Sequence, residues 1–165
     1  MVDNNIIGAL KIITEKLRNQ QIIWSLVGST NLALQGVKVE PNDIDILTNG
    51  KDAFKIHELL KEYEVRPVEL KQLDIFESYF SELNINGVKV EIMGDLKRKI
   101  GEDWTPLIER LNKTIMIDVE NVKVPVTPLE EELKAYKKLG RDKDKKKIEK
   151  ILEVLGNDFM KLKEK

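Results

Sequence analysis

Two aspartates separated by one apolar residue stand out chemically in this 165-residue chain. Asp43 and Asp45 lie in the segment Asp43-Ile44-Asp45-Ile46-Leu47, which predicts a β-strand. Because strand side chains alternate between faces, both carboxylates point the same way, while Ile44 and Ile46 face the core. Aspartate is depleted in strands, and two such carboxylates can share a hard divalent cation such as magnesium. The alternative is an ordinary exposed strand face.

A Gly-Ser dipeptide, Gly28-Ser29, precedes this pair and ends the apolar run 22–27. The run is short and rich in branched residues, so it predicts a strand that is buried on both faces. Residues 30–34 favour a helix, which predicts the order strand, tight turn, helix. Glycine at such a turn lets the backbone approach a phosphate, and the amides of the helix start face an anion. For the dipeptide alone, a plain turn with a helix cap is the commoner outcome.

Hydrophobic spacing predicts the elements that position these residues. Amphipathic helices are expected over residues 4–18 and 51–61. A strand over 63–70 contains Pro67, which indicates an edge position. Two hairpins are expected, one from 77–85 and 88–93 with its turn at Asn86-Gly87, the other from 114–119 and 122–126 with its turn at Glu120-Asn121.

Helix signals also follow the second hairpin. Thr127 can cap the free amides of a new helix, Pro128 suits its first position, and Glu130 completes a capping box. Gly140 ends this helix, and a last helix stops near Gly156.

The predicted fold class is α/β (α+β), a small mixed β-sheet flanked by helices and closed by a C-terminal helical pair. We expect a core over residues 1–126 and a helical extension over 127–165 that packs on it. Because no domain boundary is visible, the two form one structural domain.

Composition restricts the classes of site and partner. A hydrophobic fraction of 41% with 35% charged residues indicates a globular protein, and the absence of cysteine excludes disulfides, thiolate metal sites and a cysteine nucleophile. The net charge of −1 hides an asymmetry, since residues 134–165 carry +6 and residues 1–133 carry −7. A phosphate-bearing ligand could bind between them, although a solvated basic tail explains the charges equally well. Without a secretory signal or an apolar run of ~20 residues, we expect a cytoplasmic protein with no membrane association.

The two motifs together resemble the nucleotidyltransferase superfamily, which includes DNA polymerase beta, the minimal nucleotidyltransferases, and the aminoglycoside and lincosamide adenylyltransferases. The resemblance rests on Leu26-Val27-Gly28-Ser29 and Asp43-Ile44-Asp45-Ile46. It implies a nucleotidyltransferase-like fold in which Gly28 and Ser29 hold nucleotide phosphates. It also implies that Asp43 and Asp45 bind magnesium, with two ions clamping the attacking and leaving oxygens.

The same resemblance implies a third carboxylate on a later strand, which binds metal and helps activate the acceptor hydroxyl. Glu91, among apolar residues in 88–93, is the natural choice, because a buried glutamate needs a cation or hydrogen-bond donors. A salt bridge at the strand end is the alternative role for Glu91. Asp95 is the alternative carboxylate, although it could instead cap a helix.

A looser likeness covers the helical extension. It implies that Lys134, Arg141 and Lys143 lie near triphosphate charge, although in so lysine-rich a tail any one lysine is commonly solvated.

The implied activity is magnesium-dependent transfer of a nucleoside monophosphate, with ATP as the expected donor, to an acceptor hydroxyl with release of pyrophosphate. A small molecule or a protein is favoured as acceptor over nucleic acid, because the acidic body shows no basic groove. The alternative is a non-catalytic nucleotide- or partner-binding module, for example one component of a two-protein regulatory pair.

Overall fold

The computed structural model describes residues 2–163, with side chains described as far as Gly156. Of the predicted extension 127–165, residues 164 and 165 therefore lie outside the described residues. The α-helices are α1 (Asn4–Leu17), α2 (Gly28–Leu34), α3 (Gly50–Leu59), α4 (Leu129–Leu139) and α5 (Lys145–Lys163), with short 3-10 turns η1 (Lys61–Tyr63), η2 (Ile108–Lys113) and η3 (Asp142–Asp144). None of these helices is long and apolar enough to cross a bilayer.

Eight strands form one mixed sheet. The sequence predicted a mixed sheet and seven of these strands, but not the strand over 103–106. The strands are β1 (Trp24–Val27), β2 (Ile44–Thr48), β3 (Glu64–Gln72), β4 (Phe76–Ile85), β5 (Val88–Ile100), β6 (Asp103–Pro106), β7 (Ile115–Val119) and β8 (Val122–Val126). Their order is β3-β4-β5-β2-β1-β8-β7, and β6 pairs with β5. β2 and β5 run parallel, as do β1 and β8, whereas the other pairs are antiparallel. The predicted edge position of the strand that contains Pro67 is confirmed, because β3 ends the sheet.

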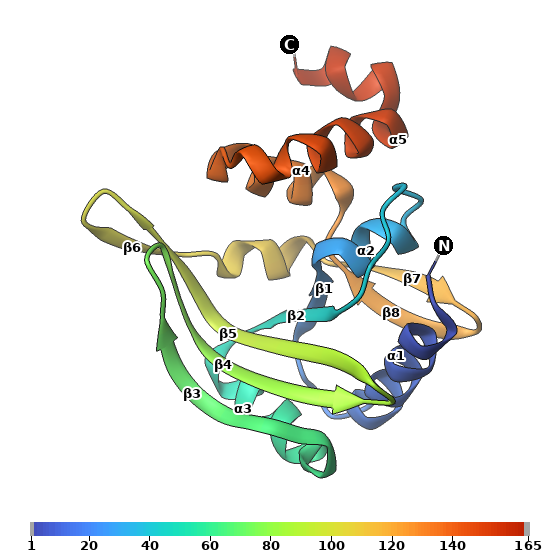
Figure 1. Ribbon diagram of the computed structural model, residues 1–165, viewed down its shortest axis with the longest axis vertical. Helices are drawn as coiled ribbons and strands as arrows, with labels where there is room; N and C mark the ends of the chain where they lie inside the picture. Colours follow the sequence, from blue (N-terminus) through green and yellow to red (C-terminus); the bar gives the residue numbers. More distant parts are fainter. Residues whose placement is uncertain (1, 164–165) are drawn as a thin grey trace.

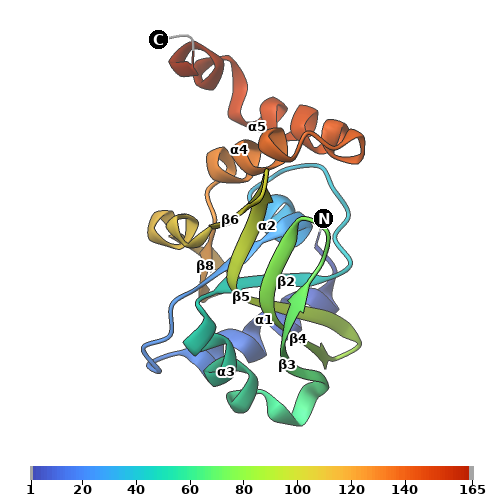
Figure 2. The same ribbon diagram turned by 90° about the vertical axis from the view of Figure 1, so that its left-hand side faces the viewer.

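Helices cover the two faces of the sheet in separate groups (Figure 1). The main core joins α1 and α3 to one face, with fully buried residues such as Leu10, Ile56 and Ile92. A second apolar cluster joins α2 to the C-terminal helices through Leu32, Leu133 and other residues. Figure 2 shows α4 and α5 at the end of the molecule above α2, with α1 and α3 at the opposite end. The C-terminal helical pair thus packs on the segment that carries the Gly-Ser dipeptide.

Both predicted hairpin turns are confirmed. Asn86 and Gly87 have φ values of 55° and 82°, and Glu120 and Asn121 have values of 45° and 74°. Positive φ at both central residues is the requirement of a type I′ turn, whose twist matches that of the flanking strands.

Two local predictions were wrong. Thr127 does not cap α4, because its hydroxyl lies 2.9 Å from that of Ser25 and Pro128 occupies the N-cap position. The strand predicted over 88–93 continues as β5 to Ile100, beyond the Asp95 backbone with φ of 51°, and then pairs with β6. A hydroxyl that is distant in sequence thus prevents Thr127 from capping the helix. Pairing with β4 and β6 extends β5 through polar residues that show no strand pattern of their own.

Candidate active site

The predicted carboxylates come together at the boundary between β2 and β5. In the parallel register Asp45 lies directly beside Glu91, and Ile44 and Ile46 are fully buried in the core. Side chains alternate along each strand, so Asp45 and Glu91 extend from the opposite face of the sheet. Asp43 immediately precedes β2 and lies two residues before Asp45, on the same side. The register therefore brings Glu91, distant in sequence, beside Asp45 and near Asp43.

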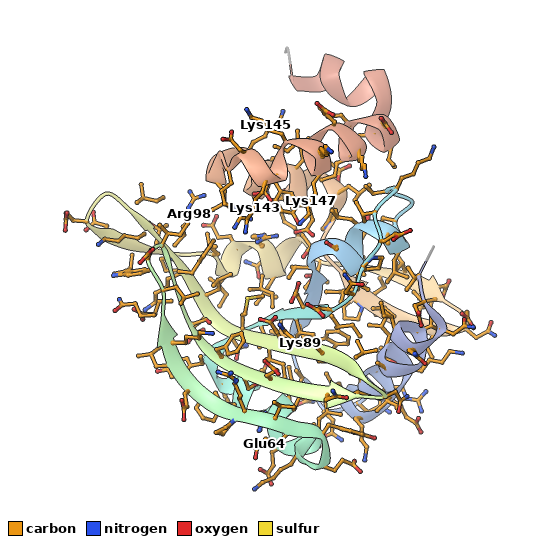
Figure 3. All side chains as sticks on the ribbon, viewed as in Figure 1. Glu64, Lys89, Arg98, Lys143, Lys145 and Lys147 are labelled. Carbon is orange, nitrogen blue, oxygen red and sulfur yellow. The ribbon has the colours of Figure 1, made fainter. Side chains whose placement is uncertain are left out.

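Lys89 is the cation of this carboxylate cluster (Figure 3). Its ammonium Nζ lies 3.1 Å from Glu91 Oε1 and 4.0 Å from Asp43 Oδ2. The hydrogen bond to Glu91 and the charges of Glu91 and Asp43 raise the pKa of Lys89, so it remains protonated. The salt-bridge alternative for Glu91 is thus present in the structure. Its partner Lys89 lies within the predicted site and only partly offsets the effects that raise the pKa of Asp45.

Asp45 is the most perturbed acid of the carboxylate cluster. Burial raises its pKa to about 7, and the charges of Glu91, Asp43 and Glu132 add to the effect. At neutral pH the site therefore lacks enough positive charge to keep every carboxylate ionised. A bound cation would correct this deficit.

Gly28 is in contact with Asp45, because β1 and β2 pair with Val27 opposite Asp45. A Cβ on Gly28 would lie 2.6 Å from Asp45 Oδ2, and the Gly28 φ of 80° is in the left-handed region. Both facts require glycine here. Ser29 follows it, half-buried, and its hydroxyl has no hydrogen-bond partner within the part of the chain that the structure describes.

The amide of Gly28 faces a carboxylate of the protein itself, whereas the resemblance implied that Gly28 holds nucleotide phosphates. It donates a hydrogen bond of 2.8 Å to Glu132 Oε2 on α4. Glu132, only 2% exposed, also accepts from Asn31 Nδ2 at 3.3 Å and pairs with an Arg110 guanidinium nitrogen at 2.6 Å. Burial raises the pKa of Glu132, while Arg110 and the Gly28 amide act in the opposite direction. Glu132 thus connects α4, α2 and η2 at the Gly-Ser turn.

The sequence analysis did not identify Glu132, Arg110 or Asn31 as site residues. A signal existed for Glu132, because it lies at helical spacing with Leu129 and Tyr136 on the buried face of α4. A glutamate at such a position needs a partner. No sequence pattern indicates that Arg110 is this partner.

Asp95, the alternative third carboxylate, has a different role. Its Oδ1 accepts a hydrogen bond of 2.8 Å from the amide of Gly50, the first residue of α3. This contact fits the helix-capping alternative and leaves Glu91 as the carboxylate beside Asp45.

A cavity of about 430 Å³ opens beside Gly28 and Glu132, between β5, β6, η2 and α4. Of the three predicted cations only Lys134 lines it, with Nζ 3.2 Å from Glu131.

Arg141 pairs with the buried Asp144 at 2.6 Å and lines a separate hollow beside Trp104. Lys143 is exposed on η3 (Figure 3) and lines neither space. Arg141 and Lys143, which were expected near the triphosphate, therefore do not line the cavity beside Gly28.

Comparison with known proteins identifies the fold and the family. The sequence profile of the aminoglycoside-2''-adenylyltransferase family matches residues 9–151. A Thermotoga maritima protein classed as a nucleotidyltransferase is 34% identical, with a TM-score of 0.82 over 93% of this chain and 96% of that one. No curated protein sequence matches.

Two further structures share the fold at low identity. ANT(2'')-Ia in complex with adenylyl-2''-tobramycin has 10% identity and a TM-score of 0.63, over 95% of this chain and 93% of that one. The lincosamide antibiotic adenylyltransferase LnuA with lincomycin bound has 14% identity and a TM-score of 0.59, over 89% of this chain and 96% of that one. With the family match and the close Thermotoga relative, these likenesses confirm the resemblance that the two motifs indicated: the chain belongs to the aminoglycoside-2''-adenylyltransferase family of nucleotidyltransferases.

Proposed function

We propose that this protein transfers AMP from ATP to an acceptor hydroxyl in a magnesium-dependent reaction that releases pyrophosphate. The observation that carries the proposal is the β2–β5 register, which puts Glu91 beside Asp45 with Asp43 two residues before it. Gly28, which is in contact with Asp45, forms the turn that we expect to lie against the nucleotide phosphates. Family membership supports the reaction class, and the adenylyl group in the names of the family and of a structural relative supports AMP as the transferred group.

The donor atoms fit magnesium, since all three carboxylates supply hard oxygen ligands and lack a sufficient counter-charge. Within the described residues, no three acidic or histidine side chains are already gathered as a metal-binding group. Asp43, Asp45 and Glu91 would therefore turn toward a shared cation, and the Lys89 ammonium would leave Glu91. Bound there, magnesium would offset the charge of phosphates and carboxylates and align the attacking and leaving oxygens.

Glu91 would accept the proton of the acceptor hydroxyl as the acceptor oxygen forms a bond to the α-phosphorus. The bond from that phosphorus to the oxygen bridging to the β-phosphorus breaks, and pyrophosphate leaves. The Ser29 hydroxyl, without a partner among the described residues, would donate to a phosphate, and the bare Cα of Gly28 permits close approach. The Gly28 amide, bound to Glu132, would hold the turn in place instead of binding the nucleotide.

We place Lys134 near the nucleotide because it lies on α4 two residues after Glu132, which accepts a hydrogen bond from the Gly28 amide. A small molecule or a protein is the expected acceptor.

Thermal unfolding with magnesium and a non-hydrolysable ATP analogue tests this proposal. At about 100 times its dissociation constant, the analogue should stabilise the protein by about 2.7 kcal/mol. The Asp43→Asn/Asp45→Asn variant should lose this shift. A matched control, Asp118→Asn/Asp142→Asn, changes two exposed aspartates and should keep it. If the wild type does not respond, or responds without metal, the proposal fails and the non-catalytic module becomes the better description.

A further inference from the structure

We infer that the acceptor is a molecule with an anionic group and an apolar body, bound in the cavity beside Gly28, and that a polycationic aminoglycoside is not the substrate. This inference rests on the proposed function, because it concerns the molecule that receives the nucleotidyl group. It depends on where the cavity lies, on its charge and on its apolar walls.

The cavity reaches the Gly28 turn next to the carboxylate cluster, although Asp43, Asp45 and Glu91 do not themselves line it. Gly28 lines it, and Gly28 lies against Asp45. Met93 lines it as well and follows Glu91 by two residues on β5, so the two side chains extend from the same face of the sheet. A molecule in the cavity would therefore present one end to Glu91, where the acceptor hydroxyl must lie.

The charge of the lining is positive. Five basic residues line the cavity, namely Arg98, Arg110, Lys113, Lys134 and Lys138, against three acidic ones, Glu109, Glu131 and Glu132. Two of the three acids are already paired, since Glu132 binds Arg110 while Glu131 binds both Lys113 and Lys134. Neither is free to receive an ammonium group of a ligand.

Arg98 and Lys138 are the cations that remain, against Glu109 as the one remaining acid of the lining. Within the described part of the chain neither forms an ion pair, although they line the cavity from opposite sides, on β5 and α4. Figure 3 shows Arg98 on the part of β5 that lies toward the C-terminal helices. Unpaired cations in a partly enclosed space attract an anion and repel a polycation.

Apolar side chains form much of the remaining wall. Leu96 and Leu107 face the cavity from the sheet side, and Tyr136 and Leu139 face it from α4. Such walls suit a ring or hydrocarbon body with a few fixed polar contacts, the usual form of a small-molecule site. The strongly hydrated triphosphate would not fill such a surface, so we assign the cavity to the acceptor.

Three probes with one phenol ring and different side-chain charge test this inference: 4-hydroxyphenylacetate, tyrosol and tyramine. Tobramycin serves as the polycation. Binding is measured by titration calorimetry on the full chain with magnesium and the non-hydrolysable ATP analogue present. We expect 4-hydroxyphenylacetate to bind about tenfold more tightly than tyramine, and tobramycin not to bind in the cavity.

The variant Arg98→Met/Lys138→Met should abolish this preference and leave the affinity for the nucleotide analogue unchanged. The control Arg66→Met/Lys146→Met removes the same two charges from exposed positions outside the cavity and should keep the preference. Equal binding of the charged probes, tighter binding of tyramine or tobramycin, or no binding of the anion at about 10 mM would overturn the inference. Weaker nucleotide binding by Arg98→Met/Lys138→Met would also overturn it, by assigning these cations to the triphosphate.

The nucleotide titration comes first and separates the two proposals. If the analogue does not bind, the proposed function fails. If it binds but the probes show no charge preference, only the acceptor class is wrong.

Discussion

Asp45 and Glu132 are two carboxylates that lie on either side of Gly28 in opposite surroundings. Glu132 is buried on α4 with a guanidinium, a backbone amide and a side-chain amide as partners. Asp45 is partly buried on β2, beside other acids, with a pKa of about 7. The protein thus supplies Glu132 with an ionic partner and hydrogen-bond donors, whereas Asp45 lies where positive charge is insufficient.

This difference separates a positioning role from a ligand-binding role. A buried charge with several donors stabilises one arrangement of the chain, so Glu132 holds three segments together at the Gly-Ser turn. A carboxylate kept among like charges destabilises the folded protein and is retained where an external cation compensates it. The site therefore combines a rigid support with a charge deficit.

Removing the support should have the largest effect. Glu132→Ala leaves the Arg110 guanidinium and the Gly28 amide without their partner in the protein interior. We expect the free energy of unfolding to fall by about 3–5 kcal/mol in urea denaturation.

Glu131→Ala is the matched control, one residue away on the same helix. It loses ion pairs to two exposed lysines, Lys113 and Lys134, and should cost less than about 1 kcal/mol. Similar losses for the two variants would contradict the supporting role of Glu132.

Disturbing the contact between Gly28 and Asp45 should have the next largest effect. Gly28→Ala combines an unfavourable φ of 80° with a Cβ 2.6 Å from Asp45 Oδ2, and we expect a loss of about 2–3 kcal/mol. Gly36→Ala is the control, because Gly36 has a φ of 94° but no atom within 4 Å of its added Cβ. It should lose about 1 kcal/mol from backbone strain alone. Equal losses would show that the contact with Asp45 has no energetic consequence.

Removing the charge deficit should stabilise the metal-free protein. The pKa of Asp45 is about 7 in the folded state against 3.8 for the free side chain, so stability falls as pH rises between these values and stays low above. Asp45→Asn lacks this titration. In EDTA at pH 8 it should exceed wild type by about 1–2 kcal/mol, with the difference vanishing near pH 4.

Asp118→Asn, at an exposed position on β7, provides the control for the pH series. Its difference from wild type should stay small between pH 4 and pH 8. If Asp45→Asn is no more stable than wild type at pH 8, the charge deficit does not exist.

The smallest effect concerns the cation within the carboxylate cluster. Lys89→Met removes the ammonium that competes for Glu91 and Asp43, so magnesium should bind about threefold more tightly in calorimetric titration. Lys123→Met, at an exposed pair with Asp118, should leave the affinity unchanged. Weaker magnesium binding by Lys89→Met would show that Lys89 assists the site instead of competing for it.

Short-range patterns predicted most of the secondary structure. Both hairpin turns and the end of α4 at Gly140, with its φ of 61°, depend on neighbouring residues alone. The prediction that Thr127 caps α4 failed because the Thr127 hydroxyl forms a hydrogen bond with the hydroxyl of Ser25, which is far away in sequence. The extension of β5 to Ile100 escaped prediction because cross-strand pairs such as Glu77 with Lys97 stabilise polar residues that show no apolar alternation.

The sequence by itself determined that Asp43 and Asp45 share a face and that a glycine ends the strand before them. Strand alternation and turn geometry are properties of a few consecutive residues, so they can be read locally. Only the tertiary structure decided that Glu91 lies beside Asp45, that Arg110 neutralises Glu132 and that Arg98 and Lys138 line one cavity. Those outcomes depend on the parallel register of β2 and β5 and on the packing of α4 against η2, which bring together groups that local patterns cannot relate.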